Sequence, residues 1–535
     1  MENRLERRLS EFFTPETAKR AGALELQGDS DPLIASIEYD SRKAGPQTLF
    51  FALSGLHTDG HKYINDAISK GAAAVVHEAE ISEKKIGIAY IKVKNSRFAM
   101  SPVAAAFYGY PSRRLLVAGV TGTEGKSTCV YLIWQLLRLA GKKAGFFSTV
   151  QYSDGGGGLA GAINGEAQWN KEHQTTPEAP EVQRMLWEMA ENDCEYAVAE
   201  SSSHGLSPRT NRLGDVEFDA ALFTNVTHEH LEFHGTWDQY RDDKANLFRV
   251  LDRSSPKSGF KEPFGVVNAD DPSAEFFAKA TKRETLSFSV KGKDADLIIN
   301  DIESAAQGNS YKVLIRKEKT LIDINDKLPG AFNAGNVLAS LLIVSGLTKI
   351  PVQELAPLCP KLLPVRGRMT SVDKGQEFEV LVDYAHTPSS FQTIFPPLRK
   401  RLDSSGGRVI SLFGSAGERD TQKRAEQGKI AARYSDIIIL TDEDPRGEVP
   451  IDILDEIACG VYAENPELFK QDKNVFLIPD RPEAIRKAFS LARKDDLVLL
   501  LGKGHENTII YKDRAMPYDE IGEAEKALEE LGIRN

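Results

Sequence analysis

The residues best suited to chemistry lie in a glycine-rich segment, GVTGTEGKST, at Gly119–Thr128. This segment joins a short apolar run to a stretch with helical periodicity, which is the arrangement of a phosphate-binding loop. Glycines let the backbone wrap around phosphates, and amides at a helix N-terminus supply positive potential. We expect Lys126 to neutralise β- and γ-phosphates and the Ser127 hydroxyl to bind Mg²⁺. The common G-x-x-x-x-G-K-[ST] pattern requires a glycine where this chain has Val120, so the loop is a variant of that pattern. The alternative interpretation is a glycine-rich turn that binds no ligand.

A carboxylate and three histidines further along the chain could bind a metal. Glu200 ends the apolar run YAVAE. At a strand end opposite a phosphate loop it is suited to Mg²⁺, because hard cations prefer oxygen ligands; a helix-capping role is the alternative. His228, His230 and His234 form H-x-H-x₃-H, which alone would suit zinc. No cysteine lies near them, and the phosphate loop favours Mg²⁺.

Alternating strand-like and helical stretches must position these residues. A helix is predicted at Ser127–Ala140, closed by Gly141. Several of the strand-like runs are almost continuously apolar, as in strands that are covered on both faces. The alternation predicts doubly wound, mostly parallel α/β sheets with ligands at the carboxyl ends of the strands. The predicted strands are Leu115–Val120, Tyr196–Glu200, Phe218–Thr224, Phe264–Asn268, Val380–His386, Arg408–Gly414, Asp436–Asp442 and Asp496–Gly502.

The chain of 535 residues is long enough for about three domains. Proline- and glycine-containing segments at Phe107–Arg114 and Leu358–Arg368 suggest two boundaries. We predict a smaller N-terminal α/β domain, a central ATP-binding domain with a mostly parallel sheet, and a C-terminal Rossmann-like doubly wound domain. Their predicted bounds are residues 1–114, 115–360 and 361–535. A glycine-rich stretch, Ser153–Gly165, is expected to be a flexible loop.

Composition excludes several classes of protein. The net charge of −11 and the pI of about 5.6 argue against a nucleic-acid binder. The start, MENRLERRLSEFF, lacks an apolar core, and no apolar run reaches the roughly 18 residues of a membrane span, so neither a secretory signal nor membrane insertion is expected. The cysteines form no C-x-x-C motif and are predicted to be buried thiols in a reducing compartment; they are Cys129, Cys194, Cys359 and Cys459.

The T-G-T-x-G-K-[ST]-T form of the loop resembles that of the Mur ligase family, the ATP-dependent amide-forming enzymes of peptidoglycan synthesis. Further segments resemble family motifs in the family's order, over nearly the whole chain. Two aspartates of the family pattern are Glu229 and Glu232 here. The matching segments are Thr175–Pro177, Glu200–His204, Phe223–Gly235, the RDDKANLF segment with Lys244, Asn268–Pro272, Leu328–Asn336, Arg366–Met369 and Val382–Pro388.

The resemblance implies ATP and two Mg²⁺ ions. It makes Lys126, Glu200, His230 and Lys244 the catalytic residues, and Ser127, Glu200, His230 and Lys244 the metal set, with Lys244 as N6-carboxylysine. An ammonium at Lys244 would repel the metals, whereas a carbamate would bind or orient one; a solvated helical lysine is the alternative. His228 and His234 could be polar loop residues. The implied ATP-binding residues are Gly122, Thr123, Glu124, Gly125, Lys126, Ser127, Thr128, Asn333 (adenine), Arg368 (phosphates) and Asp383 (ribose).

The N-terminal region, Tyr39–Val76, resembles the uridine-nucleotide domain of the family members that add the third and later residues. A folylpolyglutamate synthase lacks this domain, so a UDP-N-acetylmuramoyl-peptide substrate is implied. A glutamine common in the family is Thr210 here, in a longer loop, so contacts there stay open. The implied contacts to this substrate are Ser41, Thr175, Thr176, Ser202 and Arg212.

The C-terminal region resembles the family member that adds a diamino acid. The family's D-N-P-R segment is Glu443-Asp444-Pro445-Arg446 here. Arg446 could pair with a distal carboxylate. Asp444 in place of asparagine adds a negative charge, which favours an ammonium group at the distal end of the incoming amino acid. Meso-diaminopimelate and a simpler amino acid, lysine or ornithine, therefore both stay open. The implied amino-acid contacts are Arg419, Glu443, Asp444, Pro445, Arg446, Gly502 and Glu506.

These observations predict an ATP-dependent ligase that adds a diamino acid to UDP-N-acetylmuramoyl-L-alanyl-D-glutamate through an acyl phosphate. The partners are this nucleotide, ATP and the diamino acid, without nucleic acid. We expect a cytoplasmic monomer that serves cell-wall biogenesis and, through it, cell shape and division. The alternatives are another ligase of the superfamily, such as the D-alanyl-D-alanine-adding enzyme, and a non-catalytic nucleotide-binding regulator.

Overall fold

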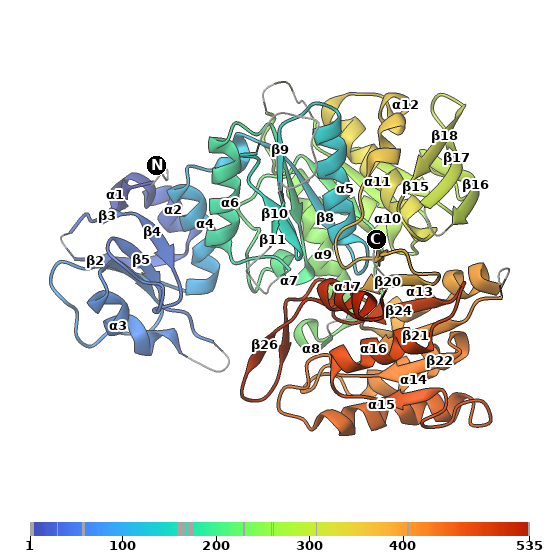
Figure 1. The fold of residues 1–535 in the computed structure, drawn as a ribbon. Helices are drawn as coiled ribbons and strands as arrows, with labels where there is room; N and C mark the ends of the chain where they lie inside the picture. Colours follow the sequence, from blue (N-terminus) through green and yellow to red (C-terminus); the bar gives the residue numbers. More distant parts are fainter. Residues whose placement is uncertain are drawn as a thin grey trace. The chain divides into compact units, whose positions relative to one another are not determined.

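The computed structural model describes residues 5–28, 30–55, 59–157, 167–169, 175–227, 231–257, 259, 262–305, 308–403 and 406–532. The chain forms two compact units. The first comprises Met1–Ile298, Ile315–Lys319 and Val337–Leu358, and the second comprises Ile299–Leu314, Thr320–Asn336 and Cys359–Asn535. Figure 1 shows the elements of both units along the chain.

The first unit begins with a five-stranded α/β sheet of order β2-β7-β6-β5-β4. Its strands β4 to β7 are mutually parallel, while β2 is antiparallel at the edge. The strands are β2 (Ala23–Gln27), β4 (Ser36–Glu38), β5 (Thr48–Phe51), β6 (Ala72–His77) and β7 (Ala89–Val93); β1 (Arg7–Arg8) pairs with β3 (Leu33–Ile34). The helices are α1 (Leu9–Phe12), α2 (Pro15–Arg20), η1 (Gly60–Tyr63), α3 (Ile64–Ser69), α4 (Ser96–Phe107) and η2 (Pro111–Arg113).

An eleven-stranded sheet follows, of order β11-β10-β9-β12-β8-β13-β14-β15-β16-β17-β18. Its strands are β8 (Leu116–Thr121), β9 (Ala144–Phe147), β10 (Gln151–Ser153), β11 (Gln168–Trp169), β12 (Tyr196–Glu200), β13 (Ala220–Phe223), β14 (Phe264–Asn268), β15 (Thr285–Ser289), β16 (Leu297–Ala305), β17 (Gly308–Ile315) and β18 (Thr320–Asp326). The helices between and after them are α5 (Lys126–Leu139), α6 (Ala179–Glu191), α7 (Ser203–Leu206), α8 (Leu231–His234), α9 (Trp237–Leu251), α10 (Ala274–Ala278), α11 (Phe332–Thr348), α12 (Val352–Leu355) and η3 (Ala356–Lys361).

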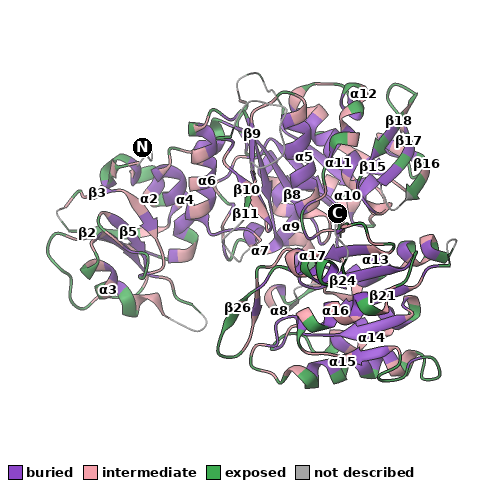
Figure 2. Ribbon diagram, viewed as in Figure 1, coloured by how far each residue is buried: buried purple, intermediate pink, exposed green. Residues whose placement is uncertain are grey.

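Strand β8 is an interior strand of this sheet. It pairs in parallel with β12 on one side and β13 on the other, and both are entirely buried. Figure 2 shows β8 itself in the colour of buried residues. The chain leaves β8 toward β9 and later returns to β13 on the opposite side. This reversal of direction is the point at which ligands bind in doubly wound sheets. The carboxyl ends of β8, β12 and β13 are therefore where a site is expected.

The second unit contains a six-stranded sheet of order β19-β20-β24-β21-β22-β23. All its neighbours are parallel except β19, which is antiparallel to β20, and apolar clusters cover both faces. The strands are β19 (Thr370–Ser371), β20 (Glu379–Asp383), β21 (Val409–Phe413), β22 (Ile437–Leu440), β23 (Val475–Leu477) and β24 (Leu497–Leu501), and β25 (Thr508–Ile510) forms a hairpin with β26 (Ala515–Pro517). The helices are α13 (Pro388–Asp403), α14 (Gln422–Tyr434), α15 (Pro450–Glu464), α16 (Arg481–Leu491) and α17 (Glu520–Glu530).

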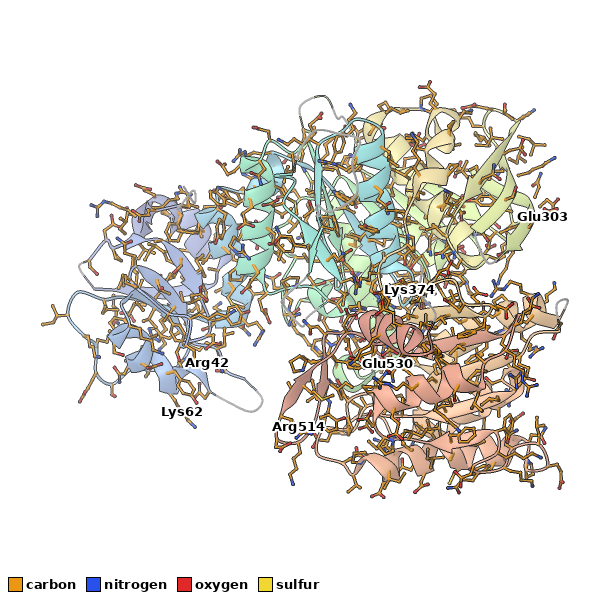
Figure 3. The ribbon with its side chains drawn as sticks, viewed as in Figure 1. Arg42, Lys62, Glu303, Lys374, Arg514 and Glu530 are labelled. Atoms are coloured by element: carbon orange, nitrogen blue, oxygen red, sulfur yellow. The ribbon has the colours of Figure 1, made fainter. Side chains whose placement is uncertain are left out.

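Charged side chains surround this second core. Figure 3 labels several of them, among them Arg514 in the turn of the β25–β26 hairpin and Glu530 at the end of α17. Lys374 lies 3.4 Å from Glu529 and 3.8 Å from Glu525, both on α17. Such exposed pairs contribute little to stability, so the apolar clusters carry the fold.

The cysteine prediction is wrong at one position. Cys129, Cys194 and Cys359 are buried, but Cys459 is exposed. Cys459 lies on α15, whose buried face is formed by Ile453, Leu454, Ile457, Ala458 and Val461. With 3.6 residues per turn, position 459 falls outside that face.

No single helix among the described residues is long and apolar enough to cross a membrane; α11 with the segment Val352–Lys361 passes the length and composition test only as a pair bent by 115°. Within α11, Leu338, Leu341 and Val344 have no exposed surface, as in a core helix. Most of the glycine-rich stretch Ser153–Gly165 lies outside the described residues.

Candidate active site

The phosphate loop has the backbone that its glycines predict. It connects β8 to α5, with Gly122 at φ +153° and Gly125 at φ +81°. A Cβ atom on Gly122 would lie 1.9 Å from the Thr224 hydroxyl, so no other residue fits there. Lys126 begins α5, and its ammonium donates to the Thr123 carbonyl at 2.7 Å. The first amides of α5 have no intrahelical partner and form a site for an anion.

The segment after β13 fixes the loop from one side. The amides of Thr123 and Glu124 donate to the backbone and side-chain oxygens of Asn225, at 2.8 and 2.9 Å. The Thr224 hydroxyl donates to the Glu124 carbonyl at 2.6 Å. These two amides thus stabilise the loop itself. Phosphate binding is left to the helix N-terminus and Lys126.

Glu200 lies beside the loop, at the end of β12. Its register partner on β8 is Val120, and the residue is 1% exposed. One carboxylate oxygen accepts from the Ser127 hydroxyl at 2.9 Å and from the Thr149 amide at 2.8 Å. The other accepts from the Thr149 hydroxyl at 3.0 Å. A buried carboxylate and a hydroxyl side by side form an oxygen donor set that fits Mg²⁺.

Sequence reasoning missed Thr149. It follows β9 by two residues, so its place after a strand end was the available signal. Among the described residues, no group of three or more histidine, cysteine and acidic side chains could hold a metal by itself. His230 and His228 lie outside the described residues, so the histidine part of the predicted metal set is not described.

Lys244 is buried rather than solvated. It lies on α9, is 1% exposed, and donates to the Gly122 carbonyl at 2.6 Å. Its ammonium is also 4.4 Å from the centre of the Tyr240 ring, and the Tyr240 hydroxyl is 3.2 Å from the Thr123 hydroxyl. Tyr240 was missed, although the i, i+4 spacing from Lys244 places both on one face of a helix. The site therefore includes a lysine and a tyrosine of α9 directly against the phosphate loop.

His234 is not the polar loop residue considered from the sequence. It ends α8, and its ring is buried. Its Nδ1 is 2.7 Å from an Asp243 carboxylate oxygen, and its Nε2 is 3.0 Å from the Ser203 hydroxyl. This chain of hydrogen bonds connects α7, α8 and α9. Asp243 directly precedes Lys244, so the chain helps to fix the helix that carries the lysine.

Three of the predicted UDP-peptide contacts come together beyond Glu200. The Thr176 hydroxyl donates to the Glu200 carbonyl and accepts from the Ser202 amide, each at 3.0 Å. Arg212 donates to the Thr176 carbonyl at 2.8 Å and to Glu178 at 2.9 Å. Thr175 directly precedes this group. Ser41 lies in a turn that follows β4 of the five-stranded sheet, and it is 8% exposed.

The predicted adenine, ribose and phosphate contacts of the second unit have partners within that unit. Both oxygens of Asp383 accept backbone amides at 2.7 Å, from Ala385 and Met369, and burial raises the pKa of this carboxyl. The Asn333 side chain donates to the Pro329 carbonyl at 2.7 Å. Arg368 lies 4.6 Å from the centre of the Tyr384 ring. Their nucleotide contacts stay a prediction.

The predicted amino-acid contacts follow the ends of parallel strands in the second unit. Arg419 is exposed and lies after β21, whereas Glu443, Asp444, Pro445 and Arg446 follow β22, and Gly502 and Glu506 follow β24. Sequence reasoning missed Lys503, whose ammonium contacts both Asp444 and Glu506. It also missed Arg481, which donates to the carbonyls of Asp442 at 3.0 Å and Leu501 at 2.7 Å. Arg481 thereby joins the ends of two strands that flank β21.

Comparisons with known proteins identify the family. The model of the Mur ligase middle domain matches residues 120–344, that of the Mur ligase, glutamate ligase domain matches residues 367–504, and that of the Mur ligase family, catalytic domain matches residues 33–108. The UDP-N-acetylmuramyl-tripeptide synthetase of Treponema denticola is 51% identical over 96% of this chain and 98% of its own length. The UDP-N-acetylmuramoyl-L-alanyl-D-glutamate–2,6-diaminopimelate ligase of Clostridium tetani is 35% identical over 95% and 97%.

A solved structure of a UDP-N-acetylmuramoyl-L-alanyl-D-glutamate–2,6-diaminopimelate ligase shares 25% identity and superposes with a TM-score of 0.60, over 93% of this chain and 95% of that one. The chain belongs to the Mur ligase family. The predicted fold class, three α/β domains with mostly parallel sheets, is confirmed.

Proposed function

We propose that this chain is the ATP-dependent, ADP-forming ligase that adds a diamino acid to UDP-N-acetylmuramoyl-L-alanyl-D-glutamate. Family membership supports the reaction type, and the names of the curated relatives support the diamino-acid step over the D-alanyl-D-alanine step. The observation that carries the proposal is the group at the ends of β8 and β12. There a phosphate loop, Lys126 and the Ser127–Glu200 pair lie next to Thr176 and Ser202.

The reaction follows from this group. The side-chain carboxylate of the D-glutamate attacks the γ-phosphorus of ATP, the bond to the bridging oxygen breaks, and ADP leaves. The amine of the diamino acid then attacks the acyl phosphate carbon, loses a proton and displaces phosphate, forming an amide. Lys126 and the first amides of α5 neutralise charge that develops on the phosphates.

Mg²⁺ would be held by the Ser127 hydroxyl and Glu200, with phosphate oxygens of ATP completing its shell; it supplies charge neutralisation. Thr149 donates twice to Glu200 and thereby keeps this carboxylate oriented toward the loop. Thr176, Ser202 and Arg212 hold the UDP-peptide so that its acceptor carboxylate meets the γ-phosphate.

Lys244 is proposed to act as a carbamate, formed from its neutral amine and CO₂ with release of a proton. Its burial and its position 2.6 Å from the Gly122 carbonyl support this role, because a cation there would oppose bound metal. The carbamate oxygens would bind or orient a metal next to the loop, and His230 is proposed to complete the set. The Tyr240 ring lies next to the Lys244 ammonium, and its hydroxyl contacts the Thr123 hydroxyl.

The remaining proposals concern the whole chain. We place the domain boundaries at residues 114/115 and 360/361, and propose a monomer that works in cytoplasmic peptidoglycan precursor synthesis. Asn333 and Asp383 are proposed to contact the nucleoside of ATP, and Arg368 its phosphates. Ser41 is proposed to bind the UDP group.

The deciding experiment measures ADP release by the purified chain with UDP-N-acetylmuramoyl-L-alanyl-D-glutamate and a panel of amino acids. We expect turnover with at least one of meso-diaminopimelate, L-lysine and L-ornithine. The UDP-tripeptide already carrying the diamino acid, offered with D-alanyl-D-alanine, is the control for the other ligase. Turnover in the control only, or no turnover at all, would contradict the proposed function.

A further inference from the structure

A buried lysine lies among the predicted amino-acid contacts of the second unit. Lys503 has no exposed surface. Its ammonium is 2.9 Å from an Asp444 oxygen and 2.5 Å from a Glu506 oxygen. One side chain therefore connects the segment after β22 with the segment after β24.

Lys503 is an ammonium in this position. Burial alone would lower its pKa, but the charges of Glu506 and Asp444 outweigh burial, and the pKa is raised. The turn that carries it leaves little freedom. Gly504 has φ +47°, and a Cβ there would lie 2.7 Å from the Gly367 carbonyl oxygen. The cation is thus held in place by the backbone as well as by its two partners.

The two carboxylates have further partners of the same chain. The Asp444 oxygen that meets Lys503 also accepts from the Ile510 amide at 3.0 Å. The other Glu506 oxygen accepts from the Tyr384 hydroxyl at 3.2 Å. The extra negative charge that aspartate brings to position 444 is therefore compensated within the protein, and is not offered to a ligand ammonium.

Two other charged side chains of the same segment each have a buried polar atom without a hydrogen-bond partner among the described residues. Glu443 is 6% exposed, and one of its oxygens is buried with no hydrogen-bond partner among the described residues. The same holds for Arg446 Nε. Glu448, two residues beyond Arg446, binds Arg424 at 2.8 and 2.9 Å. One carboxylate oxygen that can accept and one guanidinium N–H that can donate, three residues apart in the chain, are therefore available to a ligand.

Building on the proposed function, we propose that Lys503 is a specificity-determining residue of the diamino-acid site. By neutralising Asp444 and Glu506, it leaves Glu443 and Arg446 to meet the far end of the incoming amino acid. That end then carries an ammonium and a carboxylate on one carbon, as meso-diaminopimelate does. L-Lysine or L-ornithine would leave Arg446 without an anion, at a cost of about ten- to a hundredfold in kcat/KM.

The test compares kcat/KM for meso-diaminopimelate, L-lysine and L-ornithine in the full chain. Wild type is expected to prefer meso-diaminopimelate. In Lys503→Met, two uncompensated carboxylates repel a distal carboxylate, so this preference should fall at least about tenfold. Adding Asp444→Asn removes one of those charges and should restore much of the preference. Asp444→Asn alone should change the ranking of the three amino acids little, because the Lys503 ammonium still pairs with the Glu506 carboxylate.

A reverse variant covers the case in which Lys503→Met does not fold. Asp444→Asn with Glu506→Gln leaves Lys503 as an uncompensated cation and should strengthen the preference for meso-diaminopimelate over L-lysine. Lys494→Met, an exposed lysine of the same unit, is the matched control and should keep the ranking.

Three results overturn the inference: wild type that prefers L-lysine or L-ornithine, a folded Lys503→Met with the wild-type ranking, or a reverse variant with the wild-type ranking. Each of these leaves the ligase function standing. If wild type shows no turnover with any of the three diamino acids, the result contradicts the proposed function instead. The two failures are therefore distinguishable.

Discussion

At the scale of single residues, Lys126 is the side chain that tests the phosphate loop most directly. Among the residues that the structure describes, its ammonium has one hydrogen bond, to the Thr123 carbonyl, so its removal should leave the fold intact. We expect Lys126→Ala to lower kcat at least about a hundredfold, because a charge aimed at the phosphates is lost. Circular dichroism checks the fold and ADP release checks the rate. A folded variant with near-normal activity would show that the loop does not bind the triphosphate.

Lys244 tests the proposed carbamate. Lys244→Ala should be nearly inactive and should regain part of its activity in acetate or formate, since either anion supplies an oxygen near the metal. Activity is measured with and without these salts, alongside a search for the added CO₂ mass in the wild type. Lys126→Ala, treated in the same way, should gain nothing from them. Full activity of Lys244→Ala without any salt would rule the role out.

His505 predicts how the stability of the folded chain depends on pH. Burial, together with the nearby cations Arg368 and Lys503 and the adjacent His386, holds the pKa of His505 well below its usual 6.5. Below pH 6.5, His505 therefore binds a proton in the unfolded chain but not in the folded chain. The free energy of unfolding consequently falls as the pH falls. The free energy of unfolding, measured between pH 7.5 and 5, should fall less steeply in His505→Gln than in wild type. His61→Gln is the control, and equal slopes in all three proteins would contradict the prediction.

At the scale of elements, the sequence predicted most of what positions the site. Strands Tyr196–Glu200 and Phe264–Asn268 are found with the predicted bounds, and the helix after the loop starts one residue early, at Lys126. These elements are long or apolar enough to have a clear pattern. Thr149 and Lys503 were missed because their roles depend on which strand ends are neighbours. That order is set by tertiary pairing, so a position after a strand end does not by itself tell which groups the residue contacts.

The hydrogen-bond chain between α7, α8 and α9 is the element-scale feature to test. His234→Ala removes the ring that joins Ser203 to Asp243 and leaves both buried groups without this partner. We expect the free energy of unfolding to fall by about 1–3 kcal/mol. Denaturant titration measures it. Asp238→Ala, at an exposed position on α9, is the control and should change stability by about 1 kcal/mol or less. A His234→Ala variant as stable as this control would show that the chain does not secure α9.

At the scale of the whole molecule, family motifs in order predicted the fold class and the family, because they cover nearly the entire chain. They could not predict the internal pairing of Asp444 with Lys503, since the family pattern has asparagine at that position and a lysine's partner is decided only by the folded turn. Charge compensation therefore changes how the departure at position 444 is interpreted. The aspartate balances the protein's own lysine.

ATP with Mg²⁺ and the diamino acid should protect different segments, because the predicted phosphate contacts and the predicted amino-acid contacts follow different strands. ATP with Mg²⁺ is expected to protect amides of residues 119–128 and 200–203 in the first unit, whereas the diamino acid should protect residues 441–448 and 501–506 in the second. At a ligand concentration about a hundred times its Kd, each local stabilisation reaches about 2.7 kcal/mol. Hydrogen exchange with mass spectrometry, on the full chain with each ligand alone, measures both. The same exchange in Lys126→Ala should lose the first response and keep the second. If the diamino acid protects neither segment of the second unit at saturating concentration, those residues do not bind it.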